Sequence, residues 1–526
     1  MNSNVLRAVL VLAIASGLLA STAIVAVAAP GGGQKQSYIL VTGAPLTAAD
    51  AQQLKQLGAT VTFSYRYLPG AAISISPQKL GMVESLRFVR AVYSDGPVFA
   101  DAVSMELPAV GPAIDHTYNL DLINAEADDV SVTGAGVYVA VLDTGLIANW
   151  RDFLPEERVA TDLGRGFTGS NAAVNPTQWQ FDTGGHGTAV AATIVGYRLQ
   201  DDRAEGGILA EPVTGDANAD AMVRGAAPGA TIIPVKVLSD PGFGFFSMII
   251  AGIDYVTFLV TDGPLKGSRV VINMSLGGGS PSRALEASIN RAVAAGVVVV
   301  ASAGNSGNAG MGWPGAYPKV ISAGAIGYNG SFGQPASGVL PADPDNTWWF
   351  SMDPSEGAAS GNEVFIVSFS SRENQTRAAN FMCEGDVPCV QDLDVLSPGR
   401  RVLLPFPCSN GIPTFQGACG SLSNNPSDPI SSFDAVPPQY AFISGTSFSA
   451  PHTAGVVALM LEANPSLTAA QIEQIFADTA IPVPSSGSYR EVNAAMSGFN
   501  PNVWDDAFLV ATGDGLLDAA AAVDAA

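Results

Sequence analysis

The sequence predicts an α/β fold with a mainly parallel sheet, preceded by a small α+β domain. From residue 137 onward, short and continuously apolar segments alternate with helical segments, which is typical of parallel strands buried on both faces of a sheet. Residues 37–95 have a different texture, in which apolar and polar residues alternate in part of the expected strands. The 526 residues are 47% hydrophobic, so both parts have enough apolar side chains for a core.

The N-terminal segment has the pattern of a secretory signal. Arg7 precedes an apolar run over residues 9–28, which ends in the small-residue pattern Ala26-Val27-Ala28. We therefore expect cleavage after residue 28 and a protein that is secreted to the extracellular space or the cell envelope. The run is also long enough for an uncleaved membrane anchor, which is the alternative.

Residues 37–95 predict a ferredoxin-like order of elements. Strands are expected at residues 37–43, 61–67, 71–76 and 88–93. One helix opens with the capping pattern Thr47-x-x-Asp50 and ends at Gly58, and a second helix starts at Pro77. This β-α-β-β-α-β order is the ferredoxin-like plan. Residues 96–115 show little periodicity, and we expect them to be a linker.

Five apolar segments in the larger part are expected to be parallel strands, at residues 137–143, 231–238, 269–277, 296–304 and 319–327. Helices are expected at residues 187–197, 247–259, 281–295 and 446–463, with a final Ala-rich helix at the C-terminus. Polar motifs follow several strands, at the edge of a parallel sheet where ligands bind. Insertions are expected near residues 198–222, 328–364 and 373–440, which are rich in Gly, Pro, Ser, Asn and Asp.

The acidic composition narrows the choice of partners. With 24 basic and 47 acidic residues the net charge is −23, which argues against nucleic acid and against anionic membrane surfaces as partners. Only 13% of the residues are charged, so this balance reflects few Lys and Arg residues rather than a dense acidic surface. Solubility outside the cell is the simpler explanation, and acidic loops that bind cations are the alternative.

The cysteines predict disulfide bonds rather than a metal cluster. All four lie close together, at Cys383, Cys389, Cys408 and Cys419. An even number of cysteines in an exported chain favours two local disulfides, for which the sequence allows three connectivities. A metal cluster is less favoured because none of the three histidines lies in this segment.

Four polar residues stand where the predicted elements begin or end. Asp143 ends a buried strand in VAVLDTG, His186 starts a helix in GGHGTAVAA, and Asn305 ends a strand in VVVASAGN. Ser447 lies in GTSFSAPH at the start of the helix expected over 446–463, where unpaired backbone N–H groups favour negative charge. Each residue alone also has a structural explanation, because Asp and Asn form turns and a single His is more often structural than catalytic.

Together these motifs resemble the subtilisin family of serine endopeptidases, in which aspartate, histidine and serine occur in this order. The resemblance covers roughly residue 122 to the C-terminus. Further support comes from RGAAPGATIIPVKVL at residues 224–238 and GWPGAYPKVISAGA at residues 312–325. The resemblance implies a subtilisin-like three-layer fold and a serine endopeptidase that acts through an acyl-enzyme.

The resemblance also implies a role for each of the four residues. Ser447 would be the nucleophile, and His186 would be the general base that later protonates the leaving amine. Asp143 would orient the imidazole and stabilise its charged form. Asn305, together with the backbone N–H of Ser447, would bind the oxyanion.

The substrate that the resemblance implies is a polypeptide. An extended peptide would add as a strand beside Ser275, Leu276, Gly277 and Gly278. The residues that correspond to the primary specificity pocket of the family are Ala303, Gly304 and Gly312. Because these residues are small, we predict a preference for large uncharged side chains before the cleaved bond.

With residues 1–28 as the expected signal peptide, the resemblance assigns residues 29–103 to a propeptide and 104–526 to the peptidase domain with its insertions. The propeptide would assist folding and cover the active site until its removal, with processing between residues 100 and 116. An unrelated accessory domain is the alternative for residues 37–95. We expect a monomer whose partners are polypeptide substrates and, before maturation, its own propeptide.

No cofactor is expected to be required, and no residue is assigned as a metal ligand. Structural calcium is an option, because Asp152 matches a position that binds calcium in some relatives. The loop over residues 201–220 adds the hard oxygen ligands Asp202, Glu205, Asp216 and Asn218. Three departures from the family pattern, Ala189, Phe448 and Glu373, bear on substrate fit rather than on the triad.

Three other functions compete with this interpretation. A catalytically silent relative acting as a secreted binding protein would keep the fold and lose the chemistry. An α/β-hydrolase acting on esters needs Gly-x-Ser-x-Gly and places histidine last, whereas here Ser447 comes last. An acid-active relative would use Glu and Asp with serine, and His186 within its HGT motif argues against it.

Overall fold

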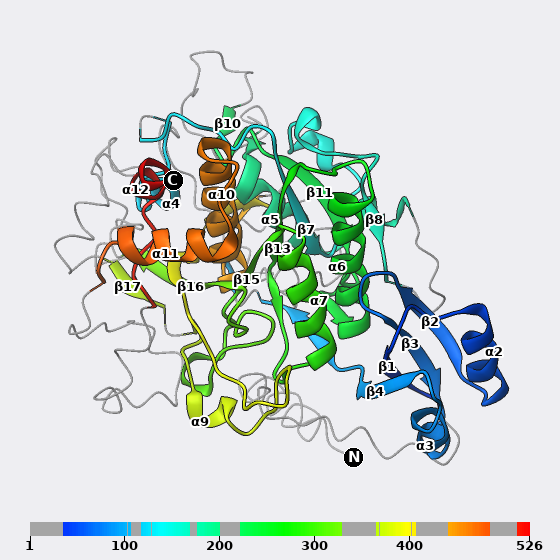
Figure 1. The fold of residues 1–526 in the computed structure, drawn as a ribbon. Coiled ribbons are helices and arrows are strands. Elements are labelled where there is room, and N and C mark those ends of the chain that lie inside the picture. Colours follow the sequence, from blue (N-terminus) through cyan, green and yellow to red (C-terminus); the bar gives the residue numbers. More distant parts are fainter. Residues whose placement is uncertain are drawn as a thin grey trace, which may run out of the picture.

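Two packed parts make up the structure, a small N-terminal domain and a larger α/β domain (Figure 1). The computed structural model describes residues 35–101, 104–106, 117–127, 129–168, 176–199, 221–328, 364–367, 369–400, 402–406, 440–483 and 513–526.

The N-terminal domain has the element order that the sequence predicts. Its elements are β1 (Gln36–Thr42), α2 (Ala48–Gln56), β2 (Thr60–Tyr65), β3 (Gly70–Ile75), α3 (Leu80–Glu84) and β4 (Val89–Ser94). The strands form an antiparallel sheet in the order β2-β3-β1-β4. A capping box between Thr47 and Asp50 starts α2. Leu54 of α2 and Val83 of α3 pack with Leu40 and Ile73 in one small core on the sheet.

A mainly parallel sheet forms the centre of the larger domain, in the order β17-β16-β15-β13-β7-β11-β8, with β18 also paired to β16. Its strands are β7 (Val137–Asp143), β8 (Arg165–Gly166), β11 (Thr231–Lys236), β13 (Arg269–Met274), β15 (Val298–Ser302), β16 (Ile321–Tyr328), β17 (Val364–Ile366) and β18 (Val395–Pro398). All pairs along this sheet are parallel except β16 with β17. The predicted α/β fold is therefore confirmed.

Helices cover both faces of this sheet, which gives three layers (Figure 1). The helices are α4 (Tyr118–Asp121), α5 (His186–Val195), α6 (Phe246–Thr261), α7 (Arg283–Ala294), α9 (Gln375–Ala378), α10 (Thr446–Ala463), α11 (Ala469–Thr479) and α12 (Ala519–Ala525). Successive residues of β7 face opposite layers: Val139 packs with the core of α5 and α10, and Ala140 with the core of α6 and α7. Burial on both faces explains why the strands are continuously apolar.

The segment expected to be a linker contributes two strands instead. β5 (Pro97–Ala100) lies between β12 (Phe243–Phe245) and β14 (Leu276–Gly277), antiparallel to both. β6 (Ser104–Glu106) pairs with β20 (Tyr440–Ser444), which pairs with β19 (Val402–Pro405). These short strands are held by backbone pairing with distant parts of the chain, so their own sequence needs no periodicity.

Several smaller predictions can be compared with the structure. Cys383 and Cys389 form one of the expected disulfides, whereas Cys408 and Cys419 lie outside the described residues. The insertion near 198–222 begins and ends with the antiparallel pair β9 (Tyr197–Leu199) and β10 (Ala221–Val223). Among the described residues, every helix is too short or too polar to cross a membrane.

Candidate active site

Asp143 and His186 form a buried pair at the carboxyl edge of the sheet. Asp143 is the last residue of β7, and His186 is the first residue of α5. His186 Nδ1 lies 2.8 Å from Asp143 Oδ1, and both side chains are fully buried. Because a carboxylate only accepts hydrogen bonds, Nδ1 carries the proton, and in the neutral imidazole Nε2 is then the atom that can take one.

The pKa of His186 is set by two opposing effects. Burial alone would lower the pKa, but the charge and hydrogen bond of Asp143 outweigh it and raise the pKa above its ordinary value. An elevated pKa means that the protonated imidazole is stabilised in this site. A base that accepts a proton during a reaction needs this property.

Asp182 joins the loop after β7 to the start of α5, and the sequence did not single it out. Its carboxylate accepts hydrogen bonds from the hydroxyl of Thr144 at 2.7 Å and from the N–H groups of Gly184 and Gly185, both at 2.8 Å. The Thr144 hydroxyl in turn accepts from Gly187 N–H at 2.9 Å. Burial raises the pKa of Asp182 to about 7. This network fixes the backbone on both sides of the Asp143–His186 pair.

Ser447 is the second residue of α10, as the sequence predicts. Gly445, with φ 154°, precedes the helix and turns the chain from β20 into it. The Ser447 hydroxyl donates to the carbonyl of Ser275 at 3.2 Å, and the Ser275 hydroxyl donates to the carbonyl of Ser447 at 2.7 Å. The ring of Phe448, the next residue, lies 5.7 Å from the ring of His186, so α10 and α5 meet at the site.

Asn305 lies just beyond β15, with its amide held in one orientation. Its Oδ1 accepts from the N–H and the hydroxyl of Thr446, at 3.0 and 2.9 Å. The Nδ2 group therefore points into the site, where it donates to the carbonyl oxygen of Asp101. The backbone N–H of Ser447 lies 3.4 Å from the same oxygen. Two donors from separate elements thus converge on one carbonyl of the chain.

The segment that holds Asp101 lies along the edge formed by residues 275–278. Ala100 pairs with Leu276 and Phe99 with Gly277, and Asp101 N–H donates to Ser275 at 3.3 Å. A Cβ atom on Gly278 would touch the carbonyl of Pro97, so glycine is what allows this close approach. The structure therefore places an extended strand where the sequence predicts one, and the occupant is residues 97–101 of the chain itself.

The predicted pocket residues lie together beside this strand. Gly312 N–H donates to the Ala303 carbonyl at 2.9 Å, and Gly304, with φ 100°, donates to the Thr446 hydroxyl at 3.2 Å. Ser302 directly precedes Ala303, and its hydroxyl donates a hydrogen bond to Asp101 Oδ2 at 2.6 Å. Sequence reasoning missed Ser302 and Asp101. Ser302 lies inside the VVVASAGN motif of residues 298–305, which was a usable signal, whereas nothing local marks Asp101.

His452, the last residue of the GTSFSAPH motif that contains Ser447, has a structural role. Its Nδ1–H donates to the Phe448 carbonyl at 2.6 Å, which leaves Nε2 to accept from Asn119 Nδ2 at 2.9 Å. Burial lowers the pKa of His452 to about 4, so the ring stays neutral. His452 thus links α10 to α4 and takes no part in proton transfer.

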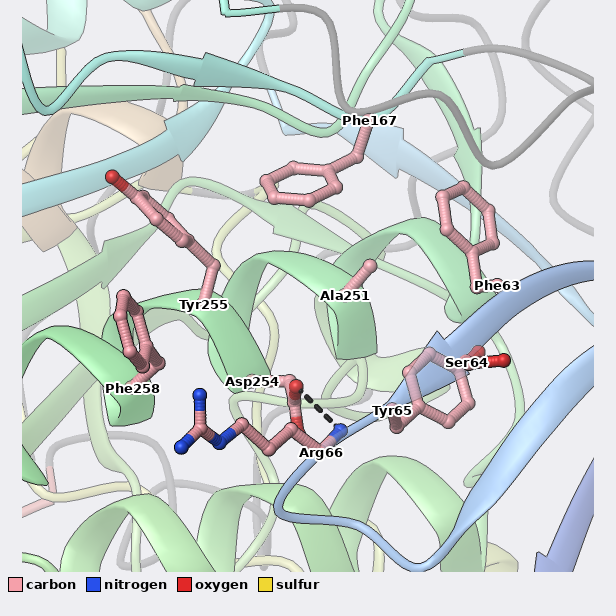
Figure 2. A pocket seen from close by; sticks show the side chains of 9 residues that line it. All are labelled: Phe63, Ser64, Tyr65, Arg66, Phe167, Ala251, Asp254, Tyr255 and Phe258. Carbon is pink, nitrogen blue, oxygen red and sulfur yellow. Dashed lines mark hydrogen bonds between the residues drawn. The ribbon is translucent and has the colours of Figure 1, made fainter. Parts of the chain in front are cut away.

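The N-terminal domain docks on α6, away from the Asp143–His186 pair. Asp254 of α6 accepts from the N–H groups of Arg66, Tyr67 and Leu68, at 2.8, 2.5 and 3.2 Å. Asp95 accepts from the N–H and hydroxyl of Ser247, near the start of α6, at 2.9 and 2.6 Å. A cavity of about 210 Å³ lies in this interface, and Figure 2 shows the aromatic side chains around it and the Arg66–Asp254 bond.

The calcium expectation finds no further support. The side chain of Asp152 accepts a hydrogen bond from Asn149 at 2.9 Å. The other expected ligands, Asp202, Glu205, Asp216 and Asn218, lie outside the described residues. Within the described part of the chain, three or more His, Cys, Asp or Glu residues never gather in a group that could hold a metal ion.

The chain is similar to known proteins in sequence and in fold. The sequence model of the subtilase family matches residues 134–508. Subtilisin DY of Bacillus licheniformis is 27% identical over 377 residues, which cover 71% of this chain and 94% of that protein. Subtilisin E of Bacillus subtilis (strain 168) is 25% identical over 441 residues, 83% of this chain and 82% of that protein.

Among solved structures, fervidolysin from Fervidobacterium pennivorans, described as a keratinolytic enzyme related to subtilisin, has a similar fold. The TM-score is 0.55 at 20% sequence identity, and the match covers 94% of this chain. The chain spans 62% of fervidolysin, which is less than two thirds of that protein's length.

Proposed function

The chain belongs to the subtilase family of serine endopeptidases, and from that premise we propose that Ser447, His186 and Asp143 are its catalytic triad. The buried hydrogen bond between Asp143 and His186 supports this assignment. Ser447 attacks the carbonyl carbon of the substrate while His186 Nε2 takes the hydroxyl proton. His186 then gives this proton to the leaving amine, and water hydrolyses the acyl-enzyme.

The observation that carries this proposal is the pair of donors on one carbonyl oxygen. Asn305 Nδ2 and the N–H of Ser447 both point to the carbonyl of Asp101, which lies beside the proposed nucleophile. Donors fixed in this way stabilise the negative charge that develops on that oxygen as a tetrahedral intermediate forms. The position of Ser447 at the start of α10 adds the partial positive charge of the helix N-terminus.

The substrates we propose are polypeptides that bind as an added strand. The backbone pairing of residues 99–100 with Gly277 and Leu276 shows how an extended chain fits this edge. Substrate preference stays a prediction: the small residues Ala303, Gly304 and Gly312 favour large uncharged side chains.

We further propose that residues 29–103 are a propeptide and that residues 104–526 are the peptidase domain of a secreted protein. Two features support the propeptide. The N-terminal domain docks on α6 through Asp254 and Asp95, and the strand that follows it pairs with Leu276 and Gly277 and brings the Asp101 carbonyl to the N–H of Ser447. While this segment holds the edge of residues 276–277, it keeps other polypeptides from pairing there. The expected signal peptide, residues 1–28, lies outside the described residues.

Casein hydrolysis and active-site labelling test the function. We expect the secreted protein to hydrolyse casein and to gain one sulfonyl group at Ser447 when treated with a sulfonyl fluoride. Ser447→Ala should abolish both, whereas Ser288→Ala, a buried serine of α7 outside the site, should abolish neither. Equal hydrolysis by the Ser447→Ala variant would refute the mechanism. Absence of both activity and labelling in the unaltered protein would favour the silent binding protein.

A further inference from the structure

A hydroxyl and a carboxyl meet in the pocket beside the proposed nucleophile. Ser302 Oγ donates a hydrogen bond to Asp101 Oδ2 at 2.6 Å. A Cβ atom on Gly277 would lie 3.1 Å from the same Oδ2 atom, so the bare glycine forms the wall against which the carboxyl packs. The pocket therefore has a polar donor that Ala303, Gly304 and Gly312 do not supply.

The backbone of Asp101 occupies the position of the residue before a cleaved bond. Its carbonyl oxygen lies between Asn305 Nδ2 and the N–H of Ser447, and its own N–H donates to Ser275 at 3.3 Å. The preceding residues, 97–100, run antiparallel to β14 like a bound substrate. The bond that follows the Asp101 carbonyl in the sequence is Asp101–Ala102, which lies within the expected processing window of residues 100–116 and moves the end of the proposed propeptide from residue 103 to residue 101.

We infer that Ser302 is a specificity-determining residue that recognises a short acidic side chain, and that the chain's own Asp101 is the residue it recognises during self-cleavage of the Asp101–Ala102 bond. This inference rests on the proposed function and names a substrate class for the same site. The predicted preference for large uncharged side chains considered only Ala303, Gly304 and Gly312. The hydroxyl of Ser302 adds a hydrogen-bond donor that favours a different substrate. The two preferences rank the same substrates in opposite order, so a single panel of substrates separates them.

The cleavage step balances with the residues present and one water molecule. Ser447 Oγ forms a bond to the Asp101 carbonyl carbon, and the bond from that carbon to the Ala102 nitrogen breaks. The hydroxyl proton passes through His186 to the Ala102 nitrogen, which leaves as an amine. Water then releases Asp101 as a new C-terminal carboxylate and restores Ser447.

Self-cleavage is the first test. Once residues 1–28 have been removed, we expect the first new N-terminus of the chain, followed over time by N-terminal sequencing and intact mass, to be Ala102. Asp101→Leu and Asp101→Lys should slow this cleavage by about 10-fold or more, since neither side chain accepts the Ser302 hydrogen bond. An earlier cut at another bond, or equal rates in the Asp101 variants, would overturn the inference.

The processed enzyme gives the second test, with substrates supplied in trans. We would use peptide p-nitroanilides that copy Val98-Phe99-Ala100 and end in aspartate, asparagine, leucine, phenylalanine or lysine. We expect Ser302→Ala to lower kcat/KM for the aspartate substrate by about 10-fold to 100-fold and to leave the leucine substrate within about 3-fold. The control Ser288→Ala should change neither.

The outcomes of the second test separate the two proposals. Hydrolysis of the leucine or phenylalanine substrate without selective loss on aspartate in Ser302→Ala would overturn the role of Ser302 and leave the endopeptidase intact. No hydrolysis of any substrate, together with no labelling of Ser447, would overturn the endopeptidase itself. If Ser302→Ala lowers kcat/KM for all substrates equally, this would also refute recognition of aspartate by Ser302. An equal loss shows general damage to the site rather than a lost contact with the aspartate side chain.

Discussion

Asn305 donates its side-chain amide to the carbonyl oxygen of Asp101, although the two residues are 204 positions apart in the sequence. The orientation of the amide comes from Thr446, whose N–H and hydroxyl both donate to Asn305 Oδ1. The donor is thus held in place before any substrate arrives, and such preorganisation is what stabilises a developing oxyanion.

Replacing Asn305 should therefore reduce turnover more than substrate binding. We expect Asn305→Ala to lower kcat by about 10²-fold to 10³-fold with a small change in KM, because the lost bond strengthens only in the transition state. Steady-state kinetics on a peptide anilide measure both constants. A rise in KM at unchanged kcat would show that Asn305 binds substrate and no oxyanion.

The Asp143–His186 bond predicts a shift in the pH profile. Activity requires neutral His186, so it rises as the pH passes the His186 pKa, which Asp143 raises above the ordinary value. In Asp143→Asn we expect the acid limb of kcat/KM to move to lower pH and kcat to fall by about 10⁴-fold. Asp152→Asn is the control and should keep the original profile. An acid limb that stays in place in Asp143→Asn would contradict this account.

The docking of the N-terminal domain should depend on Asp254. Its carboxylate accepts three backbone N–H groups, whereas Asp262 contacts the same domain through the exposed Arg66 side chain and the Tyr67 hydroxyl. After self-cleavage, Asp254→Ala should release the N-terminal domain sooner and shorten the lag before casein hydrolysis. Asp262→Ala, at an exposed ion pair, should change the lag little. Equal lags in both variants would exclude Asp254 as an anchor.

Burial of Asp101 predicts that self-cleavage depends on pH through this residue. Burial raises the pKa of Asp101 from 3.8 to about 6, while the Ser302 hydrogen bond and the nearby His186 oppose the rise and Asp143 adds to it. The pKa of Asp101 is raised while residues 97–101 are bound beside residues 275–278. Binding of this segment is therefore favoured at low pH and weakens as the pH rises toward about 6. We expect the ratio of self-cleavage rates, unaltered protein over Asp101→Asn, to fall over that range and then level off. Both proteins share the pH dependence that comes from His186, so this dependence cancels in the ratio of their rates. A ratio that does not change with pH would refute a pH dependence through Asp101.

Calcium removal tests the acidic segment over residues 201–220 and Asp152. If either binds the ion, EDTA lowers the melting temperature of the processed enzyme, and added Ca²⁺ restores it better than Mg²⁺ does. Differential scanning calorimetry measures the shift. A melting temperature that EDTA leaves unchanged would exclude structural calcium.

Most of the fold could be predicted because it depends on local patterns. The segments expected at residues 137–143 and 231–238 became β7 and β11, since continuous apolar runs are required where a sheet is covered on both faces. The strand expected at residues 269–277 is divided at Ser275 into β13 and β14, because β14 leaves the central sheet to pair with β5. The resemblance predicts an added strand at this edge, but the sequence gives no sign that residues 97–100 of the same chain supply it.

The sequence by itself determined which residues can carry the chemistry. Asp143, His186, Asn305 and Ser447 each stand at an element end within a small-residue motif, and local order is enough to identify such motifs. Only the tertiary structure decided what these residues meet: the Asp101 carbonyl between the oxyanion donors, and the Ser302 hydroxyl on the Asp101 carboxyl. The reason is physical, because a strand such as 97–100 is held by backbone hydrogen bonds to a partner far along the chain. Every residue except proline offers the same backbone N–H and C=O groups, so this pairing leaves little mark in the amino-acid sequence.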